Sequence, residues 1–246
     1  MTAKTRPLLC ELHAHTTWSD GTLSLAELVD LYGTHGFDVL AVTDHALRQD
    51  DPWPLENPGG SWIDESNYAG YLEAVQAEAE RARSRYDLVV VPGLELTYND
   101  PEPDLAGHAL AIGLRDFVSV DGGLVQGMSV ARRRGAAIVA AHPHSDMHDH
   151  SGRATRRFWR EWRELTGLID RFELFNRREV FTWVANAGLP AVASGDFHRA
   201  DHLSSWKTLL PCKKTEAAVV AYLRSSRPAY VARLERLRPG VEQAAA

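Results

Sequence analysis

The sequence predicts an α/β fold in which strands and helices alternate along one domain. Short apolar runs typical of buried strands recur from one end of the chain to the other, and segments with apolar residues at helical spacing separate most of them. Of the 246 residues, 44% are hydrophobic and 24% are charged, which is the balance of a globular protein. This alternation indicates βαβ units and a mostly parallel sheet. Periodicity alone leaves open whether the sheet closes into a barrel or stays open and doubly wound.

Seven strands are expected, with one further candidate near the C-terminal end. The seven cover residues 8–15, 37–43, 88–97, 108–114, 136–141, 171–175 and 191–194, and the further candidate covers 206–211. Helices are expected at residues 24–35, 67–85, 124–134, 155–166, 178–187 and 215–226. The first helix has the clearest boundaries, because Ser24 and Glu27 have the spacing of a capping box and Gly36 follows the last turn.

The organisation of the chain predicts one domain and two long loops. No shift in composition marks a boundary, so residues 1–238 are expected to form the domain and residues 239–246 a frayed tail. The polar stretches 50–64 and 145–153 are expected to be functional loops. The sequence has neither the run of roughly 20 apolar residues that a membrane span needs nor the apolar stretch of a signal peptide. A cytoplasmic protein that does not act on membranes is therefore expected, and the net charge of −6 disfavours a nucleic-acid partner.

Histidine and carboxylate residues gather where the expected strands end. They are His13, His15 and Asp20 near the first strand, Asp44 and His45 after the second, Glu95 in the third, His108 at the start of the fourth, His142 and His144 after the fifth, and Asp196 and His198 after the seventh. Each alone could be a hydrogen-bonded histidine, a cap or a turn residue. Together they favour a metal site, because the carboxyl ends of parallel strands share one face and buried charges there are costly unless paired or bound to metal.

The set of expected ligands indicates the kind of ion. It consists of nitrogen and oxygen atoms, and the two cysteines, Cys10 and Cys212, cannot supply a cysteine-based zinc site. Such ligands suit Zn, Mn or Fe(II), and their number exceeds the needs of one ion. Two or three divalent ions would polarise a substrate oxygen and generate hydroxide near neutral pH, so a metal-dependent hydrolase is expected.

At these residues the chain resembles the PHP family, named for polymerase and histidinol phosphatase. The resemblance runs from His13 to about Tyr230 and is carried by four motifs: His13-Ala14-His15 with Asp20, Thr43-Asp44-His45, His142-Pro143-His144, and Gly195-Asp196-Phe197-His198. It implies a TIM-like distorted (β/α)7 barrel with a trinuclear site. The implied ligands are His13, His15, Glu95 and Asp196 for one ion, Asp20, His45 and His198 for a second, and Glu95, His108 and His142 for a third, with Glu95 bridging.

The resemblance also implies a phosphoesterase. The working hypothesis is that a metal-bridging hydroxide attacks the phosphorus of a small-molecule phosphate monoester in line. Besides Asp196, four residues are expected to act in catalysis: His198 or His144 as the proton donor, and Arg48 and Arg177 as phosphate clamps. Both arginines could equally be surface cations, and Arg199 and Lys207 are weaker candidates for phosphate binding.

Several alternatives stay open. A metal-dependent amidohydrolase or lactonase would use the same site, and a non-catalytic partner module would use none of this chemistry. Trp53 and Trp62 could cover the pocket and stack on a substrate, but packing within their loop is favoured. Four further histidines are expected to face solvent: His35, His148, His150 and His202. The short spacing between Glu95 and His108 disfavours a nucleotide substrate, because the nucleotide-directed relatives in this family often have an insertion there.

Overall fold

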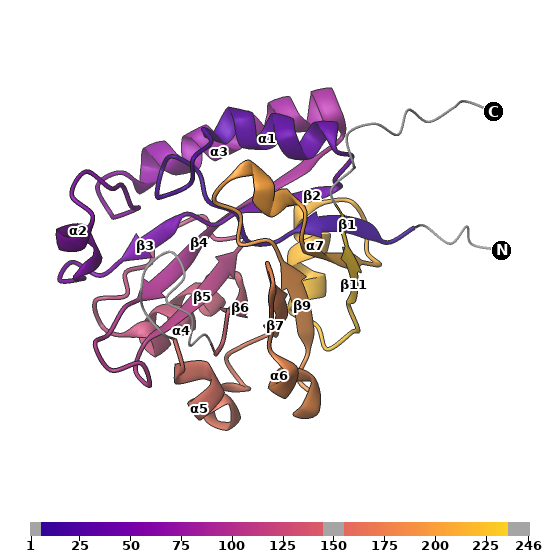
Figure 1. Ribbon diagram of the computed structural model, residues 1–246. Helices are drawn as coiled ribbons and strands as arrows, with labels where there is room; N and C mark the ends of the chain where they lie inside the picture. Colours follow the sequence, from indigo (N-terminus) through magenta and orange to yellow (C-terminus); the bar gives the residue numbers. More distant parts are fainter. Residues whose placement is uncertain (1–5, 145–154, 236–246) are drawn as a thin grey trace.

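The computed structural model describes residues 6–144 and 155–235 and has a curled mixed sheet with helices packed around it (Figure 1). The strand order is β11-β10-β1-β2-β4-β5-β6-β7-β8, with β3 beside β4 and β9 beside β7. The strands are β1 (Leu8–Glu11), β2 (Val39–Val42), β3 (His45–Leu47), β4 (Val89–Tyr98), β5 (Gly107–Ile112), β6 (Ala137–Ala141), β7 (Arg171–Asn176), β8 (Glu179–Val180), β9 (Ala191–Ser194), β10 (Trp206–Leu210) and β11 (Tyr230–Arg233). The helices are α1 (Leu25–Thr34), α2 (Trp53–Glu56), α3 (Tyr68–Tyr86), α4 (Leu124–Arg133), α5 (Arg157–Leu165), α6 (Thr182–Asn186) and α7 (Glu216–Leu223), with a short 3-10 turn η1 (Ala200–Leu203).

Helix α1 begins where the sequence predicts. The Ser24 hydroxyl accepts a hydrogen bond from the Glu27 N–H at 3.3 Å, and the Ser24 N–H donates to the Glu27 carboxylate at 2.8 Å, which completes the capping box. The helix ends before Gly36, whose φ of +73° only glycine adopts without strain. Its apolar face is buried, and it packs beside α3 over one face of the sheet (Figure 1).

The sheet curls far enough to bring its first and later strands together. Beyond the ends of β1 and β9, Ala14 and Phe197 form a parallel bridge. The His15 N–H donates to the Phe197 carbonyl at 2.8 Å, and the Phe197 N–H donates to the His13 carbonyl at 3.0 Å. Two of the predicted metal-bearing segments are therefore joined through their backbones. The predicted α/β class is confirmed, whereas the complete (β/α)7 barrel stays a prediction.

The direction of β5 corrects the expectation of a mostly parallel sheet. Strand β5 is antiparallel to both β4 and β6. Residues 99–106 are the whole connection between β4 and β5, and this is too short for the crossover of about a dozen residues that parallel neighbours need. The reversal has a consequence for the site. It brings His108, at the start of β5, level with Thr97 near the end of β4 and with Ala141 at the end of β6.

Other segments also differ from the prediction, since β3 and β11 were not among the expected strands. The helix expected at residues 178–187 shrinks to α6, because the chain after β7 first turns back at Arg177 to form the hairpin strand β8. The expected loop 50–64 contains the short helix α2 and rejoins the sheet where Ile63 bridges Ala46. The expected loop 145–153 and the expected tail 239–246 lie outside the described residues. Within 6–144 and 155–235, no helix combines the length and apolar character needed to span a membrane.

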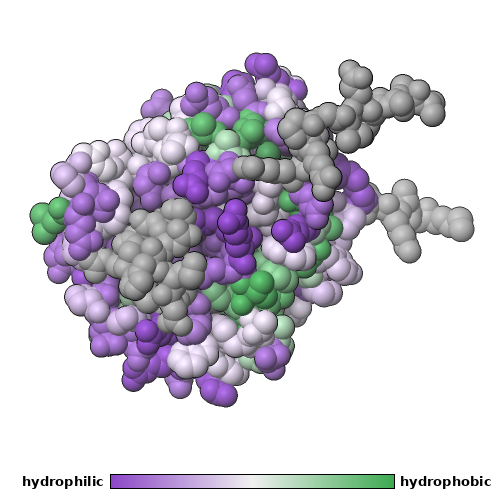
Figure 2. Space-filling model, in the orientation of Figure 1, coloured by the Kyte–Doolittle hydropathy of each residue, from purple (hydrophilic) through white to green (hydrophobic). Residues whose placement is uncertain are grey.

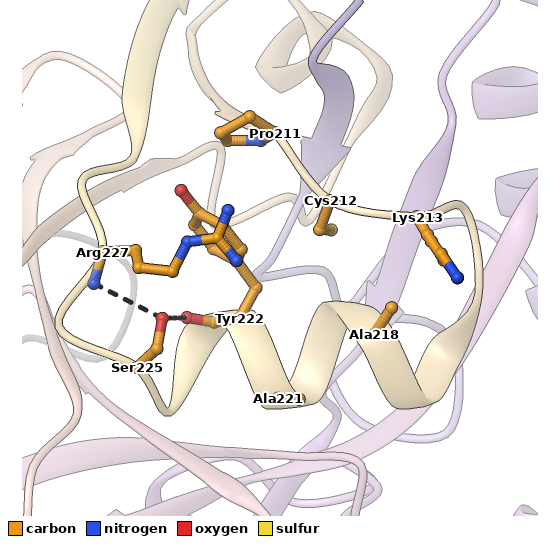
Figure 3. A pocket seen from close by; sticks show the side chains of 8 residues that line it. All are labelled: Pro211, Cys212, Lys213, Ala218, Ala221, Tyr222, Ser225 and Arg227. Atoms are coloured by element: carbon orange, nitrogen blue, oxygen red, sulfur yellow. Dashed lines mark hydrogen bonds between the residues drawn. The ribbon is translucent and has the colours of Figure 1, made fainter. Parts of the chain in front are cut away.

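A hollow of about 440 Å³ lies beside α7, at the end of the sheet opposite the strand ends that carry the histidines (Figure 3). The Arg227 guanidinium lies 4.4 Å from the centre of the Tyr222 ring at this hollow. The buried Arg171 guanidinium donates to the backbone carbonyls of Tyr222 and Leu223 at the end of α7 and of Ser225 and Arg227 in the turn after it. These contacts fix the end of the helix to the sheet, so this end of the molecule serves the fold. On the face drawn in Figure 2, hydrophilic residues prevail and hydrophobic ones form small patches.

Candidate metal centre

All nine predicted metal ligands lie at one end of the curled sheet. Their ligand atoms form three overlapping groups, within each of which every atom lies within 4.8 Å of the others. The groups are His15, Asp20, His45 and His198; His13, His15 and Asp196; and His45, Glu95 and His108. His142 reaches the same centre through Glu95, at 3.2 Å. The ligand roles themselves stay predictions.

Glu95 is the centre of the cluster. It lies on β4, is completely buried, and has five imidazole nitrogens within 3.2 Å of its two carboxylate oxygens. Oε2 lies 3.2 Å from His13 Nε2, 3.2 Å from His15 Nε2 and 3.0 Å from His45 Nδ1, and Oε1 lies 3.1 Å from His108 Nδ1 and 3.2 Å from His142 Nε2. Burial raises the pKa of Glu95, but these histidines outweigh it and hold the pKa well below its ordinary value.

A second carboxylate, Asp20, lies on the more open side of the cluster. Its oxygens lie 3.3 Å from His198 Nε2 and 3.6 Å from His45 Nε2. Burial raises the pKa of Asp20, and the two neighbouring histidines lower it far more, so the carboxylate stays ionised. The loop that carries it is fixed by Asp44, which accepts hydrogen bonds from the Thr16 N–H at 2.8 Å and the Ser19 hydroxyl at 2.6 Å. Asp44 therefore shapes the loop.

The third carboxylate, Asp196, forms an ion pair with Arg177. Its Oδ1 lies 3.4 Å from both His13 Nε2 and His198 Nδ1. Burial raises the pKa of Asp196, but Arg177 and then His13 bring it well below its ordinary value. Asp196, Arg177 and His142 have φ values of +42°, +48° and +26°, so three of the four non-glycine residues with positive φ in the described part of the chain gather here. Such backbone strain is typical of functional sites.

The histidines are strongly affected by the carboxylates. Burial lowers the pKa of His15, but Asp196 and Glu95 outweigh it and raise that pKa to about 10. The pKa of His13 is raised in the same way, by Asp196, Glu95 and Glu173 against the effect of burial. Burial dominates at His108, whose pKa falls below its ordinary value. The protonation of these buried imidazoles therefore depends strongly on the carboxylates beside them.

Glu173 on β7 belongs to the site although the sequence analysis did not select it. Its Oε1 lies 3.0 Å from His13 Nδ1, and its Oε2 accepts hydrogen bonds from the His142 N–H and the Asn176 amide, both at 2.7 Å. The Ser194 hydroxyl also donates to it. A carboxylate behind a metal-binding histidine fixes the orientation of the imidazole. The signal in the sequence is an acidic residue between two apolar residues, Phe172 and Leu174, in a strand.

The other predicted residues lie in different surroundings. The Arg48 guanidinium lies 4.6 Å from the centre of the Tyr98 ring, and its Nε lies 3.1 Å from the carboxylate of Asp50. The His144 ring lies 4.9 Å from that of Trp159. The catalytic roles proposed for Arg48, Arg177, His144 and His198 stay predictions.

Two weaker predictions are wrong. Lys207 is completely buried and forms an ion pair with Glu11, so it cannot reach a phosphate. His202, expected in solvent, is buried because η1 folds it under His198, where its Nδ1 accepts from the His198 N–H at 3.1 Å. His35 is exposed as expected, and His148 and His150 lie outside the described residues.

The residues fit divalent ions. Within the described chain, His15 Nε2 is buried without a hydrogen bond, although it lies 3.2 Å from Glu95 Oε2 and 3.5 Å from Asp196 Oδ1. Buried polar atoms in native proteins nearly always have a partner, so an atom of this kind facing two carboxylates is explained by a cation between them. The donors are imidazole and carboxylate alone, which matches Zn, Mn or Fe(II). Divalent metal binding follows as the expected property of this cluster.

Part of this sequence resembles a known protein. No family model matches the chain. An uncharacterized protein of Methanocaldococcus jannaschii is 31% identical over 106 residues, which are 42% of this chain and 41% of that protein. This chain therefore spans less than half of that relative.

Three solved structures have a similar fold. A two-domain protein of Bacteroides vulgatus, which contains a predicted PHP-like metal-dependent phosphoesterase, matches 92% of this chain and 65% of its own length, with a TM-score of 0.65 and 17% identity. A protein of Bifidobacterium adolescentis assigned as a metal-dependent phosphoesterase matches 79% of this chain and 90% of its own, with a TM-score of 0.50 and 15% identity. An amidohydrolase of Chromobacterium violaceum with bound sulfate and no metal matches 77% and 87%, with a TM-score of 0.51 and 16% identity. The resemblance to the PHP family is thus confirmed at the level of the fold: this chain has the fold of PHP-like metal-dependent phosphoesterases.

Proposed function

We propose that this protein is a PHP-family phosphoesterase that hydrolyses a phosphate monoester of a small molecule with the help of two or three divalent ions. The observation that carries the proposal is the buried Glu95 carboxylate with five imidazole nitrogens within 3.2 Å. The proposal includes the ligand sets expected from the sequence and the closure of the curled sheet as a distorted (β/α)7 barrel. Ions such as Zn, Mn or Fe, when bound, would activate water and neutralise charge on the phosphate oxygens.

The protein's own residues would supply the other parts of the reaction. Arg177 pairs with Asp196 at the edge of the cluster, where its guanidinium could bind phosphate oxygens as a bidentate donor. Arg48 would play the same part from the loop after β3. His198 lies 3.3 Å from Asp20, within a group that would hold an ion. This leaves His144 as the preferred donor of a proton to the leaving oxygen.

A second candidate function has one observation in its favour. One of the structural neighbours is an amidohydrolase, and a multinuclear site of imidazoles and carboxylates serves amide cleavage as well as phosphoester cleavage. The ion pair of Arg177 with Asp196 favours phosphate, because a neutral amide does not need a guanidinium beside the metal ligands.

The test combines metal analysis with an activity panel. The protein would be purified without chelators, its metals measured by elemental mass spectrometry, and phosphate release assayed on a panel of phosphomonoesters with added Mn or Zn. The variants His15→Ala and Asp196→Ala would be compared with His35→Ala, which removes an exposed histidine. We expect two to three ions in the wild type and in His35→Ala, and loss of both metal and phosphate release in the other two variants.

Each contrary result has a distinct meaning. A protein that binds metals but turns over no phosphoester, and instead cleaves amides or lactones, would replace the proposed function with the second candidate. A wild-type protein that takes up no metal even after reconstitution would overturn the metal site itself.

A further inference from the structure

A small cavity opens beside the candidate metal centre. It has a volume of about 240 Å³ and is lined by Asp20, Thr22, Trp53, Asn57, His198 and Arg199. Asp20 and His198 are two of the proposed ligands, so a phosphate bound at the metals would direct the rest of its molecule toward this space. The cavity is smaller than the roughly 300–1,000 Å³ of pockets that hold a whole drug-sized ligand. It therefore suits one part of a small substrate.

Three segments that are distant in the sequence build the walls. Thr22 is fixed to the segment after β9, because its N–H and its hydroxyl both donate to the His198 carbonyl, at 2.7 and 2.9 Å. Arg199 continues that segment, and its Nε donates to Asp201 at 2.8 Å. The third wall is α2, in the loop after β3. Trp53, at its start, is the large apolar residue of the lining, and the amide of Asn57, just after its end, donates to the Trp53 carbonyl at 3.1 Å.

The position of Trp53 is linked to the metal centre through buried polar residues. The backbone N–H of Trp53 donates to the Asp51 carboxylate at 2.9 Å, and the same Asp51 oxygen accepts a hydrogen bond from the Asn99 side-chain amide at 3.1 Å. The Asn99 Oδ1 lies 3.2 Å from His108 Nε2, and the other nitrogen of His108 faces Glu95. Asp51 and Asn99 are both buried. The loop that carries Trp53 is therefore connected to His108 through the buried side chains of Asp51 and Asn99.

The indole is also supported from its other side. Trp62 meets the Trp53 ring edge-on, with 6.5 Å between ring centres. Gly60 lies so close that a Cβ there would come within 2.5 Å of the Trp53 ring. The indole is therefore held in place by its neighbours in the loop. Arg199 also lines the cavity, and guanidinium groups stack on planar rings. An aromatic residue and an arginine in the lining of a narrow space favour a planar occupant.

We propose that this cavity binds the alcohol part of the substrate and that this part carries a single planar ring, recognised by Trp53 and Arg199. The inference rests on the proposed function, since the phosphate must lie at the metal centre for the ring to enter the cavity. It revises the expectation that Trp53 only packs its own loop.

The test uses two pairs of matched probes. Benzyl phosphate and cyclohexylmethyl phosphate differ in the flatness of the ring and have similar leaving groups. Their non-hydrolysable counterparts, 2-phenylethylphosphonate and 2-cyclohexylethylphosphonate, allow binding to the metal-loaded protein to be measured by calorimetry. Trp53→Leu removes the indole, and Leu55→Ala changes an exposed residue of the same short helix.

In the wild type and in Leu55→Ala, we expect the planar phosphonate to bind on the order of 10-fold more tightly than the saturated one, as for other rings stacked on aromatic side chains. The kcat/KM for benzyl phosphate should exceed that for cyclohexylmethyl phosphate by a similar factor. In Trp53→Leu both ratios should fall to about 1.

Equal binding of the two phosphonates to the wild type would overturn the inference and leave the phosphoesterase proposal standing. Failure of every phosphonate to bind, together with failure of every phosphoester to react, would overturn the proposed function. A preference for the planar probe that survives in Trp53→Leu would place the ring elsewhere.

Discussion

Glu173 Oε1 lies 3.0 Å from Nδ1 of His13, on the nitrogen opposite the one that faces Glu95. His13 thus lies between two completely buried carboxylates. Glu95 belongs to the proposed ligands, whereas Glu173 contacts the backbone of His142 and the side chain of Ser194 as well as His13. The Glu173 carboxylate thereby connects the ends of β1, β6 and β9 next to the cluster.

The first prediction concerns this carboxylate. Glu173→Gln keeps the shape of the side chain but removes the charge that orients the His13 imidazole and increases its basicity. We expect metal affinity to fall by about 10- to 100-fold, as is typical when such a partner of a metal-binding histidine is changed. Isothermal titration with Mn or Zn would measure this, and circular dichroism would verify that the fold is kept. Glu65→Gln, at an exposed position, serves as the control. Wild-type metal affinity in a folded Glu173→Gln protein would contradict the role assigned to Glu173.

Much of the site could be predicted from residue type and from position near the ends of strands. His13 and Asp196 follow apolar runs, Glu95 lies near the end of one, and parallel strands bring such positions together. His108 is instructive: it was selected at the start of a strand, and it reaches the cluster because β5 runs antiparallel to its neighbours. The short connection at residues 99–106 indicates that β5 is antiparallel to β4, but the prediction followed the alternation of strands and helices, which is typical of parallel strands.

The supporting residues could not be predicted, because their roles depend on partners far away in the sequence. Glu173 and His13 are separated by 160 positions, and Lys207 and Glu11 by 196. A lysine in a predicted strand near the C-terminus is ordinarily exposed. Only the packing of β10 against β1 shows that Lys207 is buried beside Glu11. Likewise, His202 is buried by a turn that has no sequence signal of its own.

The second prediction concerns the buried pair of Glu11 and Lys207. Glu11 accepts hydrogen bonds from the Gly195 N–H at 2.8 Å and the Tyr32 hydroxyl at 2.9 Å, besides pairing with Lys207. Burial lowers the pKa of Lys207, against the attraction of Glu11. Lys207→Met leaves the carboxylate buried and uncompensated, so we expect a loss of about 3–5 kcal/mol in the free energy of unfolding.

The double variant Glu11→Gln with Lys207→Met separates charge from packing. It removes the uncompensated charge, so its free energy of unfolding should lie above that of Lys207→Met alone. Urea denaturation of the four proteins in the cycle measures the coupling. If the effects of the two substitutions simply add, the ion pair does not stabilise the fold in the way described.

The third prediction concerns pH and Asp38, which lies away from the metal centre. Burial raises the pKa of Asp38, but hydrogen bonds from Lys214 and the Leu9 N–H, with the nearby Arg6, bring it below its ordinary value. A carboxylate whose pKa is lower in the folded than in the unfolded state stabilises the fold above its unfolded pKa of about 3.9. That stabilisation is lost as the pH falls through the folded pKa.

Asp38→Asn should therefore be less stable than the wild type by about 1–2 kcal/mol at pH 7, and the difference should shrink as the pH falls below about 4. Urea denaturation at a series of pH values measures the difference in the free energy of unfolding at pH 7 and its decrease at low pH. Asp116→Asn, at an exposed position, should show a much smaller difference at every pH. A deficit in Asp38→Asn that stays constant down to pH 2 would mean that the charge of Asp38 is not the cause.

The fourth prediction concerns removal of the metals. Glu95 and Asp196 are buried carboxylates that a bound cation would compensate, and the unfolded chain has no such arrangement of ligands. Metal should therefore stabilise the folded state by about 2.7 kcal/mol at a free concentration 100 times the Kd. For a chain of this size that corresponds to a rise in Tm of about 5–10 °C. Calorimetric scans with added Mn or Zn, and after dialysis against a chelator, measure the rise.

The dependence on concentration identifies the source of this stabilisation. Binding to the cluster predicts that Tm climbs with the logarithm of the free metal concentration, and that His15→Ala, which removes a ligand shared by two of the three groups, climbs less at every concentration. His35→Ala should follow the wild type. The same climb in His15→Ala and in the wild type would place the stabilising ions outside the cluster, because a chain that has lost a shared ligand cannot hold them there as tightly.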